Sequence, residues 1–257
     1  MTIDASALTL VPTRRELTGL GSTAELRKAL DADGAVILTG LPPGPDSMPV
    51  AAAMVLGDRL ERLFPIRRRA ERDGKAVRLH ADSFDISVET GSGPQRRRDP
   101  DEDYVLIQLE QPPATGGGNF VADAYAFADA CAAADPELWR FLTKYDVDLY
   151  GTWPDIRGLP ATPRVARHVE YTRTGRRIVR RTQGVVPLHR EPAAEHVGVM
   201  LRRLDAVLDD LEPGLPRLEL ARGEILVLDN YRCWHGRDPH TGDRTVNILT
   251  LRSTQAR

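Results

Sequence analysis

The chain has 257 residues, of which 41% are hydrophobic, and a formal net charge of −2. This length and composition suffice for a substantial core, and we expect one domain over residues 1–257. The balanced charge argues against a nucleic-acid-binding protein. The sequence contains no apolar run long enough to span a bilayer and does not start with a signal segment, so we expect a cytoplasmic protein without a membrane partner.

The chain has two cysteines, Cys131 and Cys233. Cys131 lies in an Ala-rich stretch that is typical of a helix. Two isolated thiols do not make a disulfide framework, so we expect both to be free.

The first third of the chain is predicted to be helical with one strand. Residues 14–31 have the apolar spacing of a helix, and residues 34–41 read as a short buried strand. A second helix is predicted to start at residue 46 or 47 and to run to about residue 64. A basic loop is expected at Arg67–Arg69.

The rest of the chain is predicted to be richer in strands. Alternating or apolar runs predict strands at 103–110, 217–220, 224–229 and 245–252, and a hairpin of 165–172 with 177–182. Amphipathic spacing predicts helices at about 122–133, 136–144 and 192–211. Residues 90–102 read as a mobile loop. This order fits an α+β fold with a mainly β core, as in a jelly roll, and does not fit a doubly wound parallel sheet.

His80 and Asp82 lie two positions apart in the segment VRLHADSFD. Alternate residues of an extended strand face the same side, so the imidazole and the carboxylate could converge on one metal ion. A third ligand must then come from elsewhere, and His235 follows an apolar strand in EILVLDNYRCWHGRDPHTGDR. Two histidines and one carboxylate leave positions open on Fe(II) for a co-substrate and dioxygen. Each motif alone is weak, because a lone histidine at such a place is more often a surface residue.

Three blocks of the sequence together resemble the taurine dioxygenase (TauD/TfdA-like) family: HADSF, then DYVLIQLEQPPATGGGNFVADAYAFADA, and much later RGEILVLDNYRCWHGRDPHTGDR. The resemblance covers roughly residues 30–252, with a loose match over 145–190. It implies a double-stranded β-helix (a cupin-like jelly roll) with flanking helices. It also implies Fe(II) as cofactor, with 2-oxoglutarate and O2 as co-substrates. In that family's pattern His80, Asp82 and His235 are the catalytic metal ligands.

The resemblance also indicates residues that bind 2-oxoglutarate. Asn119, after a run of three glycines, stands where the family often has a polar side chain in contact with this co-substrate. Relatives bind its distal carboxylate with an arginine on the last strand, and this sequence offers Arg244 and Arg252. The position between them, where relatives often carry another arginine, is Ile248 here. We favour Arg244 slightly and keep Arg252 as a rival.

The expected reaction is hydroxylation of an unactivated C–H bond in a small molecule. In halogenating relatives a small residue replaces the carboxylate, and here Asp82 is present. The expected substrate is an amino acid or a specialised metabolite (natural product) derived from one, by analogy with the family. Desaturation or ring formation by the same class of enzyme remains an alternative. So do a redox-silent, cupin-like metal hydrolase or isomerase, and an oxygenase that demethylates a polymer. Whether the chain forms a homo-oligomer stays open.

Other conspicuous residues are assigned more ordinary roles. His240 is expected to be solvent-exposed in a turn, and His196 to lie on the surface or in packing of a helix. The residues considered for the substrate pocket, its mouth or a lid are His168, His189, Trp153 and the runs Arg67–Arg69 and Arg96–Arg98. Arginine runs are usually solvated, but next to the site they would favour an anionic substrate.

Overall fold

The computed structural model describes residues 3–17, 23–91, 93–99, 102–149, 151, 164–182, 184–188 and 192–256, with only the backbone course for 84–90 and 95–99. The helices are η1 (Ala5–Leu8), α1 (Thr23–Asp33), α2 (Ser47–Leu56), η3 (Gly57–Arg59), α3 (Ala124–Ala134), α4 (Pro136–Lys144), α5 (Ala194–Leu211) and η4 (Glu212–Gly214). None of the described helices is long and apolar enough to cross a membrane.

The strands are β1 (Thr13–Glu16), β2 (Ala35–Thr39), β3 (Leu60–Leu63), β4 (Arg67–Arg72), β5 (Val77–His80), β6 (Phe84–Thr90), β7 (Gly93–Asp99), β8 (Tyr104–Gln111), β9 (Thr115–Gly116), β10 (Asn119–Asp123), β11 (Val147–Asp148), β12 (Val165–Ala166), β13 (Val169–Tyr171), β14 (Arg177–Val179), β15 (Ile225–Asp229), β16 (Cys233–Arg237), β17 (His240–Thr241) and β18 (Asp243–Ser253).

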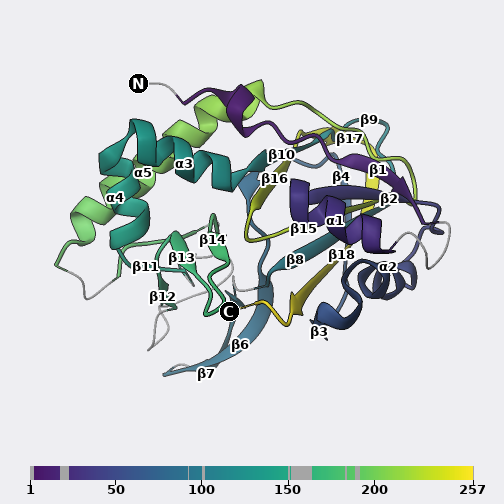
Figure 1. Cartoon of the computed structure of the whole chain (residues 1–257), viewed down its shortest axis with the longest axis horizontal. Helices are drawn as coiled ribbons and strands as arrows, with labels where there is room; N and C mark the ends of the chain where they lie inside the picture. Colours follow the sequence, from purple (N-terminus) through teal and green to yellow (C-terminus); the bar gives the residue numbers. More distant parts are fainter. Residues whose placement is uncertain are drawn as a thin grey trace.

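A seven-stranded sheet forms the centre of the molecule, in the order β1-β2-β15-β8-β18-β3, with β4 also paired to β18 (Figure 1). All its pairs are antiparallel except β1 with β2. The long strand β18 pairs with β8 along one edge. Along its other edge it pairs first with β4 and then with β3. A smaller sheet has the order β10-β16-β5.

Alternation along the strands divides the core into layers. In β2, Val36 and Leu38 pack in one apolar cluster with α1 and α2, while Ala35 and Ile37 pack in another with Val121 of the small sheet. The opposite face of the small sheet packs against α3, α4 and α5. The two sheets therefore lie between two groups of helices, as Figure 1 shows.

Local signals account for several helix starts. Asp123 accepts hydrogen bonds from the backbone N–H groups of Tyr125 and Ala126 at the start of α3. Asp135 accepts one from the Leu138 N–H and is followed by Pro136 at the first turn of α4. Such caps satisfy donors that have no partner within the helix.

Most predicted elements are confirmed. The predicted strands at 34–41, 103–110, 224–229 and 245–252 correspond to β2, β8, β15 and β18, and the three predicted helices from 122 onward to α3, α4 and α5. The Thr-Gly hairpin is β13 with β14. Both cysteines are free and buried, as expected.

Other predictions are wrong where a distant strand offers an edge. Residues 13–16, assigned partly to a helix, form β1 and pair with β2. The second helix ends at Leu56, and residues 60–63 form β3 on the edge of β18. The expected loop at Arg67–Arg69 belongs to β4, which pairs with the other part of β18. Pairing with these edges outweighs local helix and loop propensities.

Two further segments also differ from the prediction. Most of the loop expected at 90–102 is strand β7, which pairs with β6. The strand expected at 217–220 is reduced to one isolated bridge between Leu218 and Asn119.

A buried arginine links the ends of several sheet strands. Arg176 donates from Nη1 to Asp103 Oδ2 at 2.5 Å and from Nη2 to Asp229 Oδ1 at 2.7 Å. Its guanidinium also lies over the ring of Tyr104. Asp103 in turn accepts hydrogen bonds from the backbone N–H and the hydroxyl of Ser253, at the end of β18.

Replacing Arg176 by methionine should therefore lower the free energy of unfolding by about 3–5 kcal/mol, because two buried carboxylates lose their cation. Urea denaturation measures this. Arg72→Met is the control, since that side chain is 80% exposed and its acidic neighbours lie 4.0 Å away; it should change stability by less than about 1 kcal/mol. Equal losses of stability in the two variants would show that Arg176 does not stabilise the fold through these carboxylates.

His168 makes stability depend on pH. It is buried, its ring packs against Phe141, and Nδ1 lies 3.0 Å from the carbonyl oxygen of Arg180. Burial lowers the pKa of His168 from 6.5 to about 4. As pH falls below 6.5 the unfolded chain takes up a proton that the folded chain does not, so the folded state loses stability until about pH 4.

At pH 5 this histidine should cost about 2 kcal/mol of unfolding free energy relative to pH 8. His168→Asn should show a correspondingly smaller loss over that range in denaturant titrations of metal-free protein. An unchanged pH dependence in the variant would show that His168 titrates normally in the fold.

Candidate metal centre

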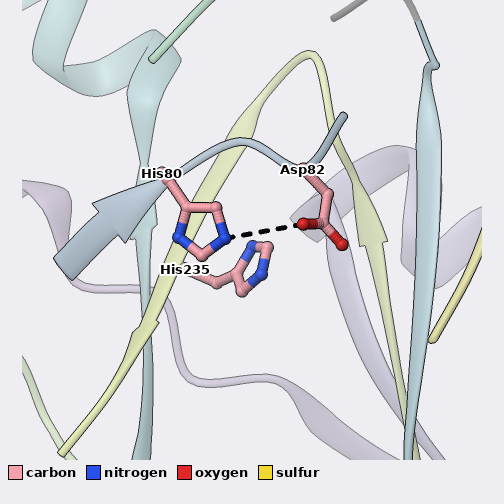
Figure 2. A group of neighbouring side chains, drawn as sticks. All are labelled: His80, Asp82 and His235. Atoms are coloured by element: carbon pink, nitrogen blue, oxygen red, sulfur yellow. Dashed lines mark ion pairs between the residues drawn. The ribbon is translucent and has the colours of Figure 1, made fainter. Parts of the chain in front are cut away.

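His80, Asp82 and His235 converge between the two sheets (Figure 2). His80 ends β5 and is the direct cross-strand partner of His235 in β16. Asp82 lies just beyond the end of β5, not on the same strand as the sequence had suggested. One ligand atom from each residue lies within 4.8 Å of the others. This spacing allows all three to reach one metal ion.

The neighbours of Asp82 hold its backbone and its carboxylate. The Asp82 N–H donates to Asn230 Oδ1 at 2.8 Å, and Asn230 Nδ2 donates to the Asp82 carbonyl at 2.9 Å. Arg67 Nη2 lies 3.2 Å from Asp82 Oδ2. Asn230 was not among the site residues expected from the sequence, although it directly follows the apolar strand that leads to His235.

The two histidines have ring nitrogens free for a metal. His80 Nδ1 lies 2.9 Å from the Arg78 carbonyl oxygen, which can only accept, so Nδ1 carries the proton and Nε2 a lone pair. That Nε2 faces Asp82 Oδ1 at 3.5 Å. His235 Nδ1 is buried and has no hydrogen-bond partner among the described residues.

The charge states also suit a divalent cation. Burial by itself would raise the pKa of Asp82, but Arg67 and the neighbouring histidines hold it well below its usual range. Burial lowers the pKa of His235 to about 3. The carboxylate is therefore ionised and the His235 imidazole neutral near pH 7, as metal ligands must be. The donor set fits a metal such as Fe(II).

A cavity extends from these residues between the sheets. Ile107, Val246 and Ile248 give it apolar walls, and Asn119 and Arg244 also line it. The backbone of Asn119, at the start of β10, pairs with Arg237 in the neighbouring strand.

Arg244 is an unusual residue to find in such a cavity. Its side chain is buried, and no carboxylate within 4.0 Å pairs with it among the residues described. Burial and the nearby Arg237 lower the pKa of Arg244 to about 10. A buried guanidinium without a counter-ion is costly, and it becomes favourable when a ligand carboxylate binds in its fork.

Arg252 lies elsewhere. It is 3.9 Å from Glu102 and near the ring of Phe64, and it does not line the cavities of the described part of the chain. The two arginines are eight residues apart on β18, so they lie roughly 26 Å apart along the strand. Arg244 is at the end of β18 that borders the cavity, and Arg252 is near the opposite end, where β18 pairs with β3.

Several other histidine predictions have clear outcomes. His240 was expected to be exposed, but it is buried: its ring lies close to Gly74, and its Nε2 is 3.9 Å from Glu71. His168 packs against Phe141 and does not line the cavities described for the chain. His196 is exposed on α5 and its ring contacts Tyr145, as expected. His189 lies outside the described residues.

Of the remaining candidates for the substrate pocket, some border the site and the others lie outside the described residues. Arg67 and Arg69 of β4 line a second cavity beside the first, so the expected basic loop is a strand that borders the site. Trp153 and the side chains of Arg96–Arg98 lie outside the described part of the structure.

Comparison with known proteins agrees with this geometry. The model of the taurine catabolism dioxygenase TauD, TfdA family matches residues 12–251. No curated protein sequence matches the chain. A putative alpha-ketoglutarate-dependent taurine dioxygenase from Burkholderia xenovorans superposes with a TM-score of 0.62 at 16% identity, covering 97% of this chain and 90% of that one.

Two other solved structures share the fold. AAD-2 in complex with Mn(II) and N-oxalylglycine has a TM-score of 0.63 at 14% identity, with 96% of this chain and 97% of that chain covered. PvcB, described as an Fe, alpha-ketoglutarate dependent oxygenase from an isonitrile synthetic pathway, has a TM-score of 0.55 at 15% identity, with 91% and 84% covered.

The family has a cupin-like jelly-roll fold, and the mixed α/β architecture with its mainly β core is consistent with it. The family match spans nearly the whole chain, and the candidate metal triad lies within it. The chain therefore belongs to the TauD/TfdA family and is an oxygenase that uses Fe(II) and 2-oxoglutarate.

Proposed function

We propose that the chain hydroxylates an unactivated C–H bond of a small molecule, an amino acid or a specialised metabolite derived from one. His80, Asp82 and His235 would hold Fe(II), and Arg244 and Asn119 would bind 2-oxoglutarate. One observation carries this proposal: a single cavity is lined by the three candidate ligands and by Arg244, a buried arginine that pairs with no carboxylate among the described residues. A redox-silent hydrolase would not need that arginine.

Each group in the cavity has a distinct task. The Arg244 guanidinium donates paired hydrogen bonds to the distal carboxylate of 2-oxoglutarate. The Asn119 amide offers a further polar contact, and the apolar walls of the cavity exclude water. Iron, when bound, supplies the activation of dioxygen. In the overall reaction one oxygen atom enters the C–H bond to give an alcohol. The other enters succinate, and carbon dioxide leaves from 2-oxoglutarate.

The second cavity supports the proposed substrate class. It shares His80 and Asp82 with the first cavity. Arg69 and Glu71 line both cavities, and as alternate residues of β4 they face the same side. A positive and a negative side chain at one opening suit a zwitterion such as an amino acid.

Two considerations concern the reaction type and the fold. With a carboxylate at position 82 the metal site has no place for a halide in that position, so hydroxylation is the expected outcome, with desaturation or ring closure as the alternative. We also propose that the two facing sheets are the halves of a double-stranded β-helix.

The purified protein should form succinate from 2-oxoglutarate with Fe(II), ascorbate and oxygen, and amino acids should stimulate this turnover. His80→Ala should abolish it, because the metal loses one of its ligands. His196→Ala, on the exposed face of α5, is the control and should keep full activity. Absence of succinate with a broad panel of amino acids and amino-acid-derived compounds, from protein shown to hold iron, would contradict the proposal.

The two arginines of β18 give a matched pair for the co-substrate site. Arg244→Met should raise the KM for 2-oxoglutarate by roughly 10-fold to 100-fold, the effect of losing hydrogen bonds to a charged group. Arg252→Met should leave this KM unchanged while lowering thermal stability, because Arg252 lies beside the buried Glu102. The reverse pattern in initial-rate kinetics would assign the co-substrate to Arg252.

A further inference from the structure

The two oxygens of the Asp82 carboxylate face different neighbours, Arg67 on one side and His80 on the other. Arg67 Nη2 lies 3.2 Å from Oδ2, while Oδ1 faces Nε2 of His80 at 3.5 Å. The side chains of Arg67 and Asp82 are only 13% and 6% exposed. A contact of this kind in a site that excludes water holds its geometry far better than a surface ion pair.

The position of Arg67 is set by the sheet. It is the first residue of β4, where its backbone partner is Ile248 of β18, and Ile248 lines both cavities. Among the described residues Asp82 is the only carboxylate paired with Arg67. The guanidinium therefore has one anionic partner, and that partner is a candidate metal ligand.

How a carboxylate binds the metal decides how many positions remain. Two histidines and one carboxylate oxygen leave a face of the metal open for the co-substrate and dioxygen. Carboxylates also bind metals through both oxygens. If Asp82 did so, it would occupy a position that the reaction needs.

We propose that Arg67 is a positioning residue: it retains Oδ2 of Asp82 and leaves Oδ1 as the single metal donor. This goes beyond the proposed function and rests on its metal centre. Arg67 contacts neither the co-substrate nor the reacting atoms in this role. It acts through Asp82, as hydrogen-bond partners of metal ligands commonly do.

The matched variants come from one strand. Arg67→Met removes the guanidinium, and Arg67→Lys keeps a cation that can donate to Oδ2. Arg68→Met is the control, because Arg68 is the next residue of β4 and pairs with Glu110 at 3.0 Å on the exposed side. If Arg67→Met does not fold, Arg67→Gln serves instead, since its uncharged side chain is too short to reach Asp82 from the same backbone position.

The test is a crystal structure of each protein with Mn(II) and 2-oxoglutarate, joined to succinate kinetics. Wild type, Arg68→Met and Arg67→Lys should bind the metal through one Asp82 oxygen, and Arg67→Met through both. The kcat for succinate formation should fall about 10-fold or more in Arg67→Met and recover partly in Arg67→Lys. The KM for 2-oxoglutarate should stay nearly the same in both variants.

Two results would overturn the inference: one-oxygen binding of Asp82 in Arg67→Met, or equal kcat values for Arg67→Met and Arg68→Met. Wild-type protein that binds no Mn(II) at His80, Asp82 and His235 is a different outcome. It would show that these three residues do not form a metal centre, and it would contradict the role of Arg67 as well.

Discussion

The pairing of β16 with β5 sets His235 opposite His80, and the rest of the site is arranged around this pair. The close approach depends on Gly236, where a Cβ atom would lie 2.3 Å from the Phe120 ring and 2.7 Å from the Val77 carbonyl oxygen. Trp234, on the other side of His235 in sequence, packs in the cluster against the helices. Alternation along β16 therefore turns His235 into the space between the sheets.

Buried charge is balanced around this centre in a way that favours an anionic ligand. Asp82 is paired with Arg67, and Arg237 with Glu71 at 3.2 Å. Arg244 keeps its charge without such a partner in the described structure. A buried charge that has lost its ion-pair partner is strongly destabilising. An unpaired buried cation is therefore stabilised when an anionic ligand binds beside it. The proposed co-substrate, a dicarboxylate, would meet this requirement with one carboxylate at the metal and the other at Arg244.

Local patterns in the sequence predicted much of the fold and the metal triad. The strands and helices from residue 103 to the C-terminus had clear periodicity, and His80, Asp82 and His235 stood in motifs that resemble a known family. Three of the errors share one cause: β1, β3 and β4 form because distant strands offer them a backbone edge. Periodicity within a segment carries no information about such partners.

The same limit applies to the supporting residues of the site. Arg67 looked like part of a solvated arginine run, and its contact with Asp82 depends on where β4 pairs. His240 looked like a turn residue and is buried beside Gly74 and Glu71. Choosing between Arg244 and Arg252 required knowing which end of β18 borders the cavity, which the sequence does not mark.

One cavity joins the candidate metal ligands to Arg244, the arginine proposed to bind 2-oxoglutarate. Calorimetric titration of 2-oxoglutarate into the protein with and without Mn(II) tests whether the co-substrate binds both at once. We expect tight binding to the Mn(II)-loaded protein, and much weaker binding both without metal and in His235→Ala. Equal affinity with and without Mn(II) would show that the co-substrate does not meet the metal in this cavity.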